Sequence, residues 1–253
     1  MSPSGILWSR RSPTDRRQPF HVKSEALGPL VERYRLGDGQ RWQLEAILGE
    51  LEGDRGAPTA VADAHKAVDV HLADSLAVLE VADLAGVTRI ADIGSGAGFP
   101  GLALAVALPE GEVSLVESQR RKCGFLERVC AAAGVENAHV VCARVEAWQD
   151  GISSNDVVVA RALAPQPVVL EYAAPLLNLG GVLIDWRGRR NTEGEAHARD
   201  AAGALGLCLR EIRHVEPYEG ALHHHLHVYE KVAETPARFP RRVGVARKRP
   251  LGC

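Results

Sequence analysis

The chain of 253 residues contains 46% hydrophobic and 25% charged residues, a composition typical of a globular protein with one large α/β domain or two small ones. Its longest uninterrupted apolar stretch, Leu102–Leu108, is too short to span a membrane, and we expect no secretory signal. The five cysteines include no C-x-x-C pair, so neither a zinc ribbon nor a disulfide framework is expected, and a reducing, cytoplasmic location is favoured.

The two ends of the chain are basic and the middle is acidic. Residues 1–23 carry five cations and one acid, and residues 235–253 carry six cations and no acid, which leaves a net charge of −12 between them. We expect residues 1–23, rich in Ser, Pro and Arg, to be a disordered extension, and residues 235–253 to form a basic tail. This distribution indicates an acidic body whose ends contact an anionic partner such as nucleic acid.

The elements expected in between form two parts. Residues 24–85 show helical spacing of apolar residues and predict an N-terminal helical segment. In residues 86–234, short apolar runs alternate with helical patterns, which is typical of a parallel sheet. The expected strands are Arg89–Ile93, Glu112–Glu117, Ala138–Cys142, Asp156–Ala160, Gly181–Trp186, Cys208–Val215 and His224–Lys231, the last two joined as an antiparallel hairpin. The expected helices are Pro100–Leu108, Arg120–Ala133, Gln166–Asn178 and Glu193–Leu205.

The strongest local signal is a glycine-rich loop that follows the first of these strands and precedes a helix. Glycines at positions 94, 96 and 98 let the backbone turn tightly and approach a ligand closely. Glu117 ends the next strand, where a carboxylate can accept hydrogen bonds from both hydroxyls of a ribose. The loop and this acid predict a site for a cofactor that contains a nucleoside.

Two cofactors compete for this site. Residues 96–101 match G-x-G-x-x-G, so an NAD-dependent oxidoreductase is one alternative. S-adenosylmethionine is favoured because Asp92 can order the loop and face a cationic amino-acid group. In addition, Val145 and Glu146 follow the third strand, where a backbone N–H and an acid can read the adenine edge.

Several motifs together resemble one known family. The chain carries G-S-G-A-G-F-P-G at 94–101, R-V-E at 144–146, H-L-A-D-S-L at 71–76, R-A at 161–162 and R-K-R-P-L at 247–251. In these motifs it resembles the bacterial 16S ribosomal RNA guanine-N7 methyltransferases, the glucose-inhibited division protein B family. The chain differs from the family pattern at Leu163, where an aromatic residue is usual, and at Arg187, where a lysine is usual.

The resemblance implies a Rossmann-like α/β fold of the class I S-adenosylmethionine-dependent methyltransferases, with a mostly parallel seven-stranded sheet that ends in an antiparallel hairpin. It implies formation of 7-methylguanine in the 530 loop of 16S ribosomal RNA, with that RNA or the small ribosomal subunit as partner and no membrane. We expect a monomer. From the motifs and the resemblance, the cofactor contacts are expected at Asp92, Gly94, Gly96, Gly98, Phe99, Glu117, Val145, Glu146 and Arg161.

Arg161, at the end of the fourth strand, is the residue expected at the methyl transfer. Its guanidinium fork can pair with the methionine carboxylate or donate to guanine O6. Guanine N7 has a free lone pair and loses no proton on attack, so this chemistry tolerates a site without a general base. The tail residues expected to contact RNA phosphates are Arg241, Arg242, Arg247, Lys248 and Arg249.

Four histidines, at positions 223, 224, 225 and 227, lie in and just before the last predicted strand. No carboxylate or cysteine accompanies them at ligand spacing, so we expect no metal site. Two further hypotheses compete with an RNA methyltransferase: a small-molecule methyltransferase with the same cofactor site, and a non-catalytic RNA-binding module.

Overall fold

The structure of the protein, a computed structural model, describes residues 18–54, 56–59, 61 and 63–252. Most of the expected disordered extension lies outside these residues. Helix α1, however, begins at Gln18 and continues to Arg33, so it includes residues 18–23, which were expected to belong to the extension. Leu27 and Leu30 of this helix are buried in the core. Their packing holds the helix in place, and residues 18–23 form its first turns.

The N-terminal segment is helical, as predicted. Helix α2 (Asp38–Gly53) follows α1, and α3 (Ala64–Ala67) continues through a π-helical turn (Val68–Ala73) into α4 (Asp74–Leu76) and a 3₁₀ turn (Ala77–Glu80). Helix α2 buries its leucines and isoleucine against the rest of the fold. Single π-helical turns occur frequently at functional sites, and this one faces the ends of the strands described below.

The sheet has seven strands in the order β3-β2-β1-β4-β5-β7-β6, with β7 antiparallel to both of its neighbours and the other pairs parallel. The expected arrangement, a mostly parallel sheet that ends in an antiparallel hairpin, is therefore confirmed. The strands are β1 (Arg89–Ile93), β2 (Glu112–Glu117), β3 (Ala138–Cys142), β4 (Asn155–Arg161), β5 (Leu177–Arg187), β6 (Leu207–Val215) and β7 (His224–Lys231).

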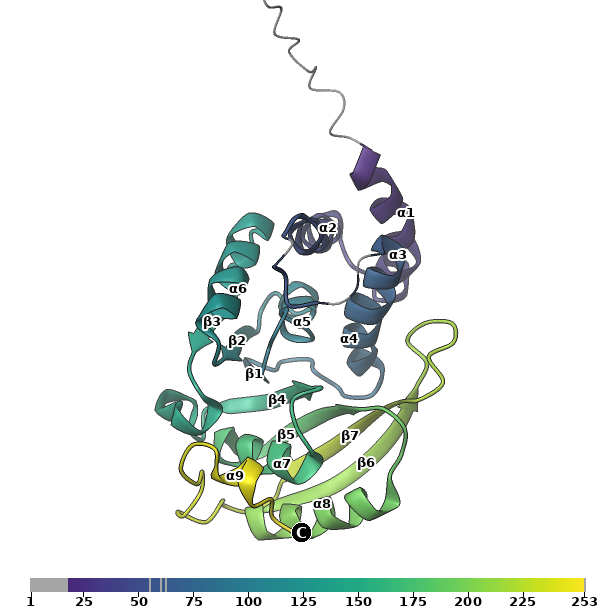
Figure 1. Ribbon diagram of the computed structural model, residues 1–253. Helices are drawn as coiled ribbons and strands as arrows, with labels where there is room; N and C mark the ends of the chain where they lie inside the picture. The colour runs from purple at the N-terminus through teal and green to yellow at the C-terminus, as the bar shows by residue number, and fades with distance from the viewer. Residues whose placement is uncertain (1–17, 55, 60, 62, 253) are drawn as a thin grey trace, which may run out of the picture.

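Helices cover both faces of the sheet (Figure 1). The N-terminal helices, α5 (Gly101–Ala107) and α6 (Arg120–Ala133) pack on one face, and α7 (Gln166–Ala173), α8 (Thr192–Leu205) and α9 (Val245–Lys248) on the other. Successive strand side chains point to opposite faces, so Ile90 belongs to the first apolar core and Ala91 to the second. Both faces are thus buried, which explains the continuous apolar runs in the parallel strands.

Two expected details are wrong. The helix predicted to run to Asn178 ends at Ala173, because a 3₁₀ turn that contains Pro175 leads directly into β5. Cys123 on α6 and Cys142 at the end of β3 form a disulfide, with 5.8 Å between their Cα atoms, although no disulfide was expected. No cysteine spacing signals this pair, because it forms only where α6 packs beside the neighbouring strand. None of the described helices is both long and apolar enough to span a membrane.

Candidate cofactor and methyl-transfer site

The glycine-rich loop connects β1 to α5 in a conformation that needs glycine. Gly94, Gly96 and Gly98 have φ angles of +77°, +59° and +99°, in the left-handed region. A Cβ at Gly94 would lie 2.4 Å from Cδ1 of Leu163, and one at Gly98 would lie 2.3 Å from Cδ1 of Leu102. Two of these glycines therefore permit both the turn and the close approach of neighbouring side chains.

Asp92, in strand β1, holds this loop through two hydrogen bonds. Its side chain is buried, and Oδ2 accepts a hydrogen bond from the Gly101 N–H at 3.0 Å, while its carbonyl accepts one from the Ser95 hydroxyl at 2.8 Å. Burial raises the pKa of Asp92 to about 7, although the bond from Gly101 acts in the opposite direction. Asp92 thus takes the loop-ordering role that was predicted for it, but it does not line the cavity described next.

A cavity of about 200 Å³ lies beside the loop, at the carboxyl ends of β1, β2, β3 and β4. Four of the residues expected to bind the cofactor line it: Gly94, Glu117, Val145 and Glu146. Gly96, Gly98, Phe99 and Arg161 do not line the cavity; the first three belong to the loop itself and Arg161 ends β4. Oε2 of Glu117 accepts from the Gly96 N–H at 3.2 Å, and Oε1 accepts from the Gln119 N–H at 2.8 Å.

The hydrogen bonds of the loop decide which cofactor fits. A pyrophosphate needs free N–H groups at the start of the helix that follows such a loop. Here the N–H groups of Gly94 and Ser95 donate to the carbonyl of Val116, and that of Gly101 donates to Asp92. These three N–H groups are therefore bonded within the protein and are not available to a pyrophosphate, and of Asp92 and Glu117 it is Glu117 whose carboxylate lines the cavity. A left-handed glycine cradle with a buried carboxylate at the adjacent strand end fits the nucleoside of S-adenosylmethionine, which carries no phosphate.

Arg161 lies at the end of β4, next to this loop. Its Nη1 donates to the carbonyl of Val70, in the π-helical turn, and to Oδ2 of Asp74, each at 2.8 Å. Both bonds use Nη1, so Nε and Nη2 have no hydrogen bond to any residue that the structure describes and can reach a ligand. The guanidinium carbon is 6.0 Å from the centre of the Phe99 ring, within the range of a cation–π contact.

Two histidines to which the sequence assigned no role lie beside Arg161: His71 contacts Phe99, and His224 contacts Asp74. His71 stacks on Phe99 with 4.7 Å between ring centroids, and its Nε2 is 2.8 Å from the Thr59 hydroxyl. Burial lowers the pKa of His71 to about 4, so the ring is neutral at physiological pH. His224 lies with Nδ1 2.8 Å from Oδ1 of Asp74. The H-x-x-D spacing at 71–74 was the available signal for His71, whereas nothing in the sequence connects His224 to that motif.

The basic C-terminal residues pack against the body of the protein. Arg241 forms an ion pair with buried Glu171 of α7, with 2.7 Å between Nε and Oε1. The N–H of Gly244 donates to Glu146 at 2.9 Å, and Nη2 of Arg247 donates to the carbonyl of Leu163 at 3.0 Å. Arg247 also lines the cavity.

Phe239 and Ala246 bury their side chains and attach the expected basic tail, residues 235–253, to the body of the protein. Arg241 is held in a structural ion pair rather than free for RNA. By contrast, Arg242, Lys248 and Arg249 have exposed side chains. Of the five residues expected to contact phosphates, Arg241 is in an ion pair with Glu171, Arg247 lines the cofactor cavity, and the other three are exposed.

No group of His, Cys, Asp or Glu side chains able to hold a metal ion occurs within the described part of the chain. The four histidines contact different partners. Nε2 of His223 is 2.9 Å from Arg189, Nδ1 of His225 is 2.9 Å from the carbonyl of Gly188, and Nδ1 of His227 is 2.8 Å from Gln166.

Comparison with known proteins gives a consistent result. The family model described as rRNA small subunit methyltransferase G (GidB) matches residues 55–217. A protein named ribosomal RNA small subunit methyltransferase G from Syntrophomonas wolfei is 41% identical over 189 residues, covering 73% of this chain and 86% of its own. One of the same name from Rubrobacter xylanophilus is 38% identical over 258 residues, covering 95% and 97%.

Among solved structures, an S-adenosylmethionine-dependent methyltransferase from Aquifex aeolicus superposes with a TM-score of 0.54 at 14% identity. The match covers 66% of this chain and 93% of that one. At this identity the likeness concerns the fold alone, and it is the fold expected from the sequence.

Proposed function

Because the chain belongs to the rRNA small subunit methyltransferase G family, we propose that it methylates N7 of a guanine in the 530 loop of 16S ribosomal RNA. The family makes it an S-adenosylmethionine-dependent methyltransferase of 16S ribosomal RNA. The atom and the loop are the proposal. One observation carries it: among the described residues, Arg161 is anchored through Nη1 alone, beside Phe99 and the cofactor loop.

Different residues of the cavity would contact different parts of the cofactor. Glu117 would hold the ribose hydroxyls, and Val145 and Glu146 would contact the adenine, while the backbone at Gly94 admits the ligand without a Cβ in the way. When bound, S-adenosylmethionine supplies a methyl group on a positively charged sulfur. The protein therefore has mainly to align the attacking atom with that methyl group.

Arg161 would select the guanine. Its Nε and Nη2 can donate to O6, and this leaves N7 with its lone pair free. Attack by N7 releases no proton, so no general base is needed. Methylation leaves a positive charge on the purine, and Asp74, 2.8 Å from Nη1, offsets the charge of Arg161 so that the product is not repelled.

The proposal is tested with purified protein, S-adenosylmethionine and small ribosomal subunits from a strain that lacks this modification. After digestion to nucleosides, mass spectrometry should show 7-methylguanosine, and R161K should reduce its yield sharply because lysine lacks the planar fork. R128K, a matched change on the exposed surface of α6, should not. Methylation of a different base or of a guanine amine by the wild type would contradict the proposal.

We also propose that the enzyme acts as a monomer in the cytoplasm. The loop and the strand ends that line the cofactor cavity belong to one sheet of this fold, and the substrate of the family is ribosomal RNA.

A further inference from the structure

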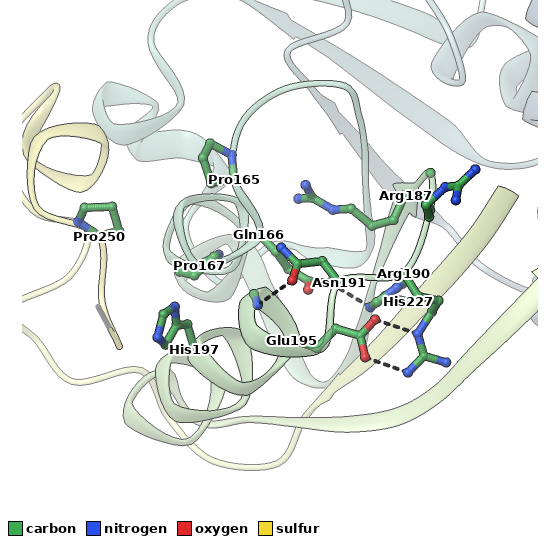
Figure 2. Close-up of a pocket in the computed structure, with 13 residues that line it drawn as sticks. Pro165, Gln166, Pro167, Arg187, Arg190, Asn191, Glu195, His197, His227 and Pro250 are labelled. Carbon is green, nitrogen blue, oxygen red and sulfur yellow. Dashed lines mark hydrogen bonds and ion pairs between the residues drawn. The ribbon is translucent and has the colours of Figure 1, made fainter. Parts of the chain in front are cut away.

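A second, larger cavity of about 500 Å³ lies where the start of α7, the end of β5 and the start of α8 meet (Figure 2). We call it the α7–α8 pocket. The residues of its lining that matter here are Pro165, Pro167, Pro250, Arg187, Arg190 and His227. Its volume is within the range of sites that bind small ligands.

The α7–α8 pocket adjoins the cofactor cavity. Arg187 is the last residue of β5 and follows Trp186, which pairs with Arg161, so its side chain points to the opposite face of the sheet from that of Arg161. Nη1 of Arg187 donates to the carbonyl of Ala164 at 2.9 Å, in the short segment between the two cavities. The C-terminal residues connect them as well, because Arg247 lines the cofactor cavity and Pro250 lines the α7–α8 pocket. A ligand in this pocket would therefore lie close to the cofactor cavity.

His227 is buried in the wall of the pocket with one ring nitrogen unused. The residue is 1% exposed, and Nε2 has no hydrogen-bond partner among the described residues. Burial lowers the pKa of His227 to about 4, so the ring is neutral. Buried polar groups are nearly always hydrogen-bonded, so this nitrogen is available to a ligand atom or a water molecule in the pocket.

The neighbours of His227 determine what that ligand atom must be. The amide nitrogen of Gln166 lies 2.8 Å from Nδ1 of His227 and also donates a hydrogen bond to Asp185. Asp185 in turn forms an ion pair with Arg187, with 2.6 Å between Oδ2 and Nε. Because the amide donates to Nδ1, the single ring hydrogen of neutral His227 is on Nε2. The pocket thus offers a donor, and its ligand must present an acceptor.

The walls of the pocket differ in character. Figure 2 shows the three prolines on one side and Arg187 and Arg190 on the other. Three arginines (187, 189 and 190) line the pocket together with the carboxylate of Glu195, and Asp185 lies directly behind. The balance of these five groups is positive. An apolar wall, a buried donor and a cationic rim together fit a flat ring that has an acceptor atom and an anionic substituent.

We propose that the α7–α8 pocket binds one unstacked nucleotide of the RNA substrate, close to the cofactor cavity. The base lies on the proline side with a ring nitrogen or carbonyl oxygen on Nε2–H of His227, and its phosphate lies at the arginine rim. Proteins commonly read RNA through bases that are splayed out of the stack. The assignment rests on the proposed function, because it takes RNA as the substrate.

The test uses the full chain saturated with S-adenosylhomocysteine, so that an added nucleotide cannot enter the cofactor cavity. Nucleoside 5′-monophosphates and inorganic phosphate are titrated separately by calorimetry. We expect a monophosphate to bind and phosphate alone not to bind. H227F, which removes the donor, should weaken binding by about tenfold, and H227Q, whose amide nitrogen can replace Nε2, should recover most of it.

A second pair of variants covers the case in which H227F fails to fold. Arg190 and Arg210 are both exposed and each pairs with one glutamate, Glu195 and Glu230, at 2.5 Å and 2.6 Å. R190A should weaken binding of both the monophosphate and 16S ribosomal RNA by about three- to tenfold, while R210A should leave both unchanged.

The outcomes separate this inference from the proposed function. Equal affinities in wild type, H227F and R190A would overturn the pocket assignment, as would binding of phosphate alone with the same affinity as the nucleotide. If no 7-methylguanine forms while nucleotide binding still depends on His227 and Arg190, the proposed methylation is wrong and the pocket assignment stands.

Discussion

Asp74 binds Arg161 and His224 at the same time. Its Oδ2 is 2.8 Å from Nη1 of Arg161 and its Oδ1 is 2.8 Å from Nδ1 of His224, while its backbone carbonyl accepts from the indole N–H of Trp186 at 3.0 Å. One buried residue of the N-terminal helical segment therefore contacts β4, β5 and β7. This carboxylate fixes the position of the arginine beside the cofactor loop.

From this relationship we expect D74N to lower kcat for RNA methylation by about tenfold or more, since a misplaced reacting group is costly even at 1 Å. The affinity for S-adenosylhomocysteine should change little, because Asp74 does not line the cofactor cavity. The measurement is single-turnover methylation with a parallel titration of the cofactor product. D83N, an exposed aspartate in the same segment, is the control. An unchanged kcat in D74N would show that Arg161 does not need this anchor.

We expect G94A to abolish measurable cofactor binding. The new methyl group would lie 2.4 Å from Leu163, and the φ of +77° is strained for alanine. G39A is the matched control, since Gly39 is in helix α2 with no atom within 4 Å of the added Cβ, and this change should stabilise the protein by roughly 0.5–1 kcal/mol. Calorimetric titration with S-adenosylhomocysteine checks both, and normal binding by G94A would rule out the loop as the cofactor site.

The fold could be predicted closely from the sequence, because apolar runs and glycines report local conformation. Strands β1, β2, β3 and β7 begin and end where they were expected. The site could be predicted only in part. The glycine loop and Glu117 are signals within one βαβ unit, whereas Asp74 meets His224 across 150 residues of sequence. Such a pair depends on how helices pack on the sheet, which periodicity does not report.

The C-terminal residues illustrate the same limit. Their charge indicated a basic tail that contacts RNA, but no charge count shows that Arg241 pairs with buried Glu171. Likewise, the disulfide of Cys123 and Cys142 depends on the contact between a helix and a strand end. The charge of a segment indicates which kind of partner it binds. Whether the segment packs against the rest of the protein depends on tertiary contacts.

Deletion of residues 235–253 should destabilise the protein by about 3–5 kcal/mol, because it leaves Glu171 buried without its partner. Urea unfolding monitored by circular dichroism measures this loss. The deletion should also weaken cofactor binding, since Arg247 lines the cavity. A truncated protein as stable as the full chain would contradict the packing described above.

The triple variant R242A/K248A/R249A should behave differently from the deletion. These three side chains are exposed, so stability should be unchanged. If they contact RNA phosphates, the affinity for 16S ribosomal RNA should fall and the slope of log K against log salt should flatten by about 2. Filter binding at several salt concentrations measures the slope. Equal slopes for the variant and the wild type would exclude the three cations from the RNA contact.

The stability of the protein should depend on the ionisation of Asp92. Its pKa is raised to about 7 from a usual value of 3.8, so the folded state binds a proton that the unfolded state has released between these two values. Folding stability from this group is therefore full below about pH 4 and is lost as the pH rises toward 7.

The free energy of unfolding of the wild type minus that of D92N should thus be larger at pH 5 than at pH 8. The change between the two pH values should exceed about 1 kcal/mol. Urea unfolding of both proteins at the two pH values checks this. A difference that does not change with pH would mean that Asp92 titrates near its usual value.

The most direct test of the whole account is chemical mapping of 7-methylguanine in 16S ribosomal RNA. Borohydride reduction followed by aniline cleaves the strand only where this base occurs, and primer extension locates the break. In a strain that lacks the gene, we expect no break in the 530 loop, a break when the wild-type gene is restored, and almost none with R161K. A break that persists without the gene, or fails to return with it, would contradict the assignment of this enzyme to guanine N7.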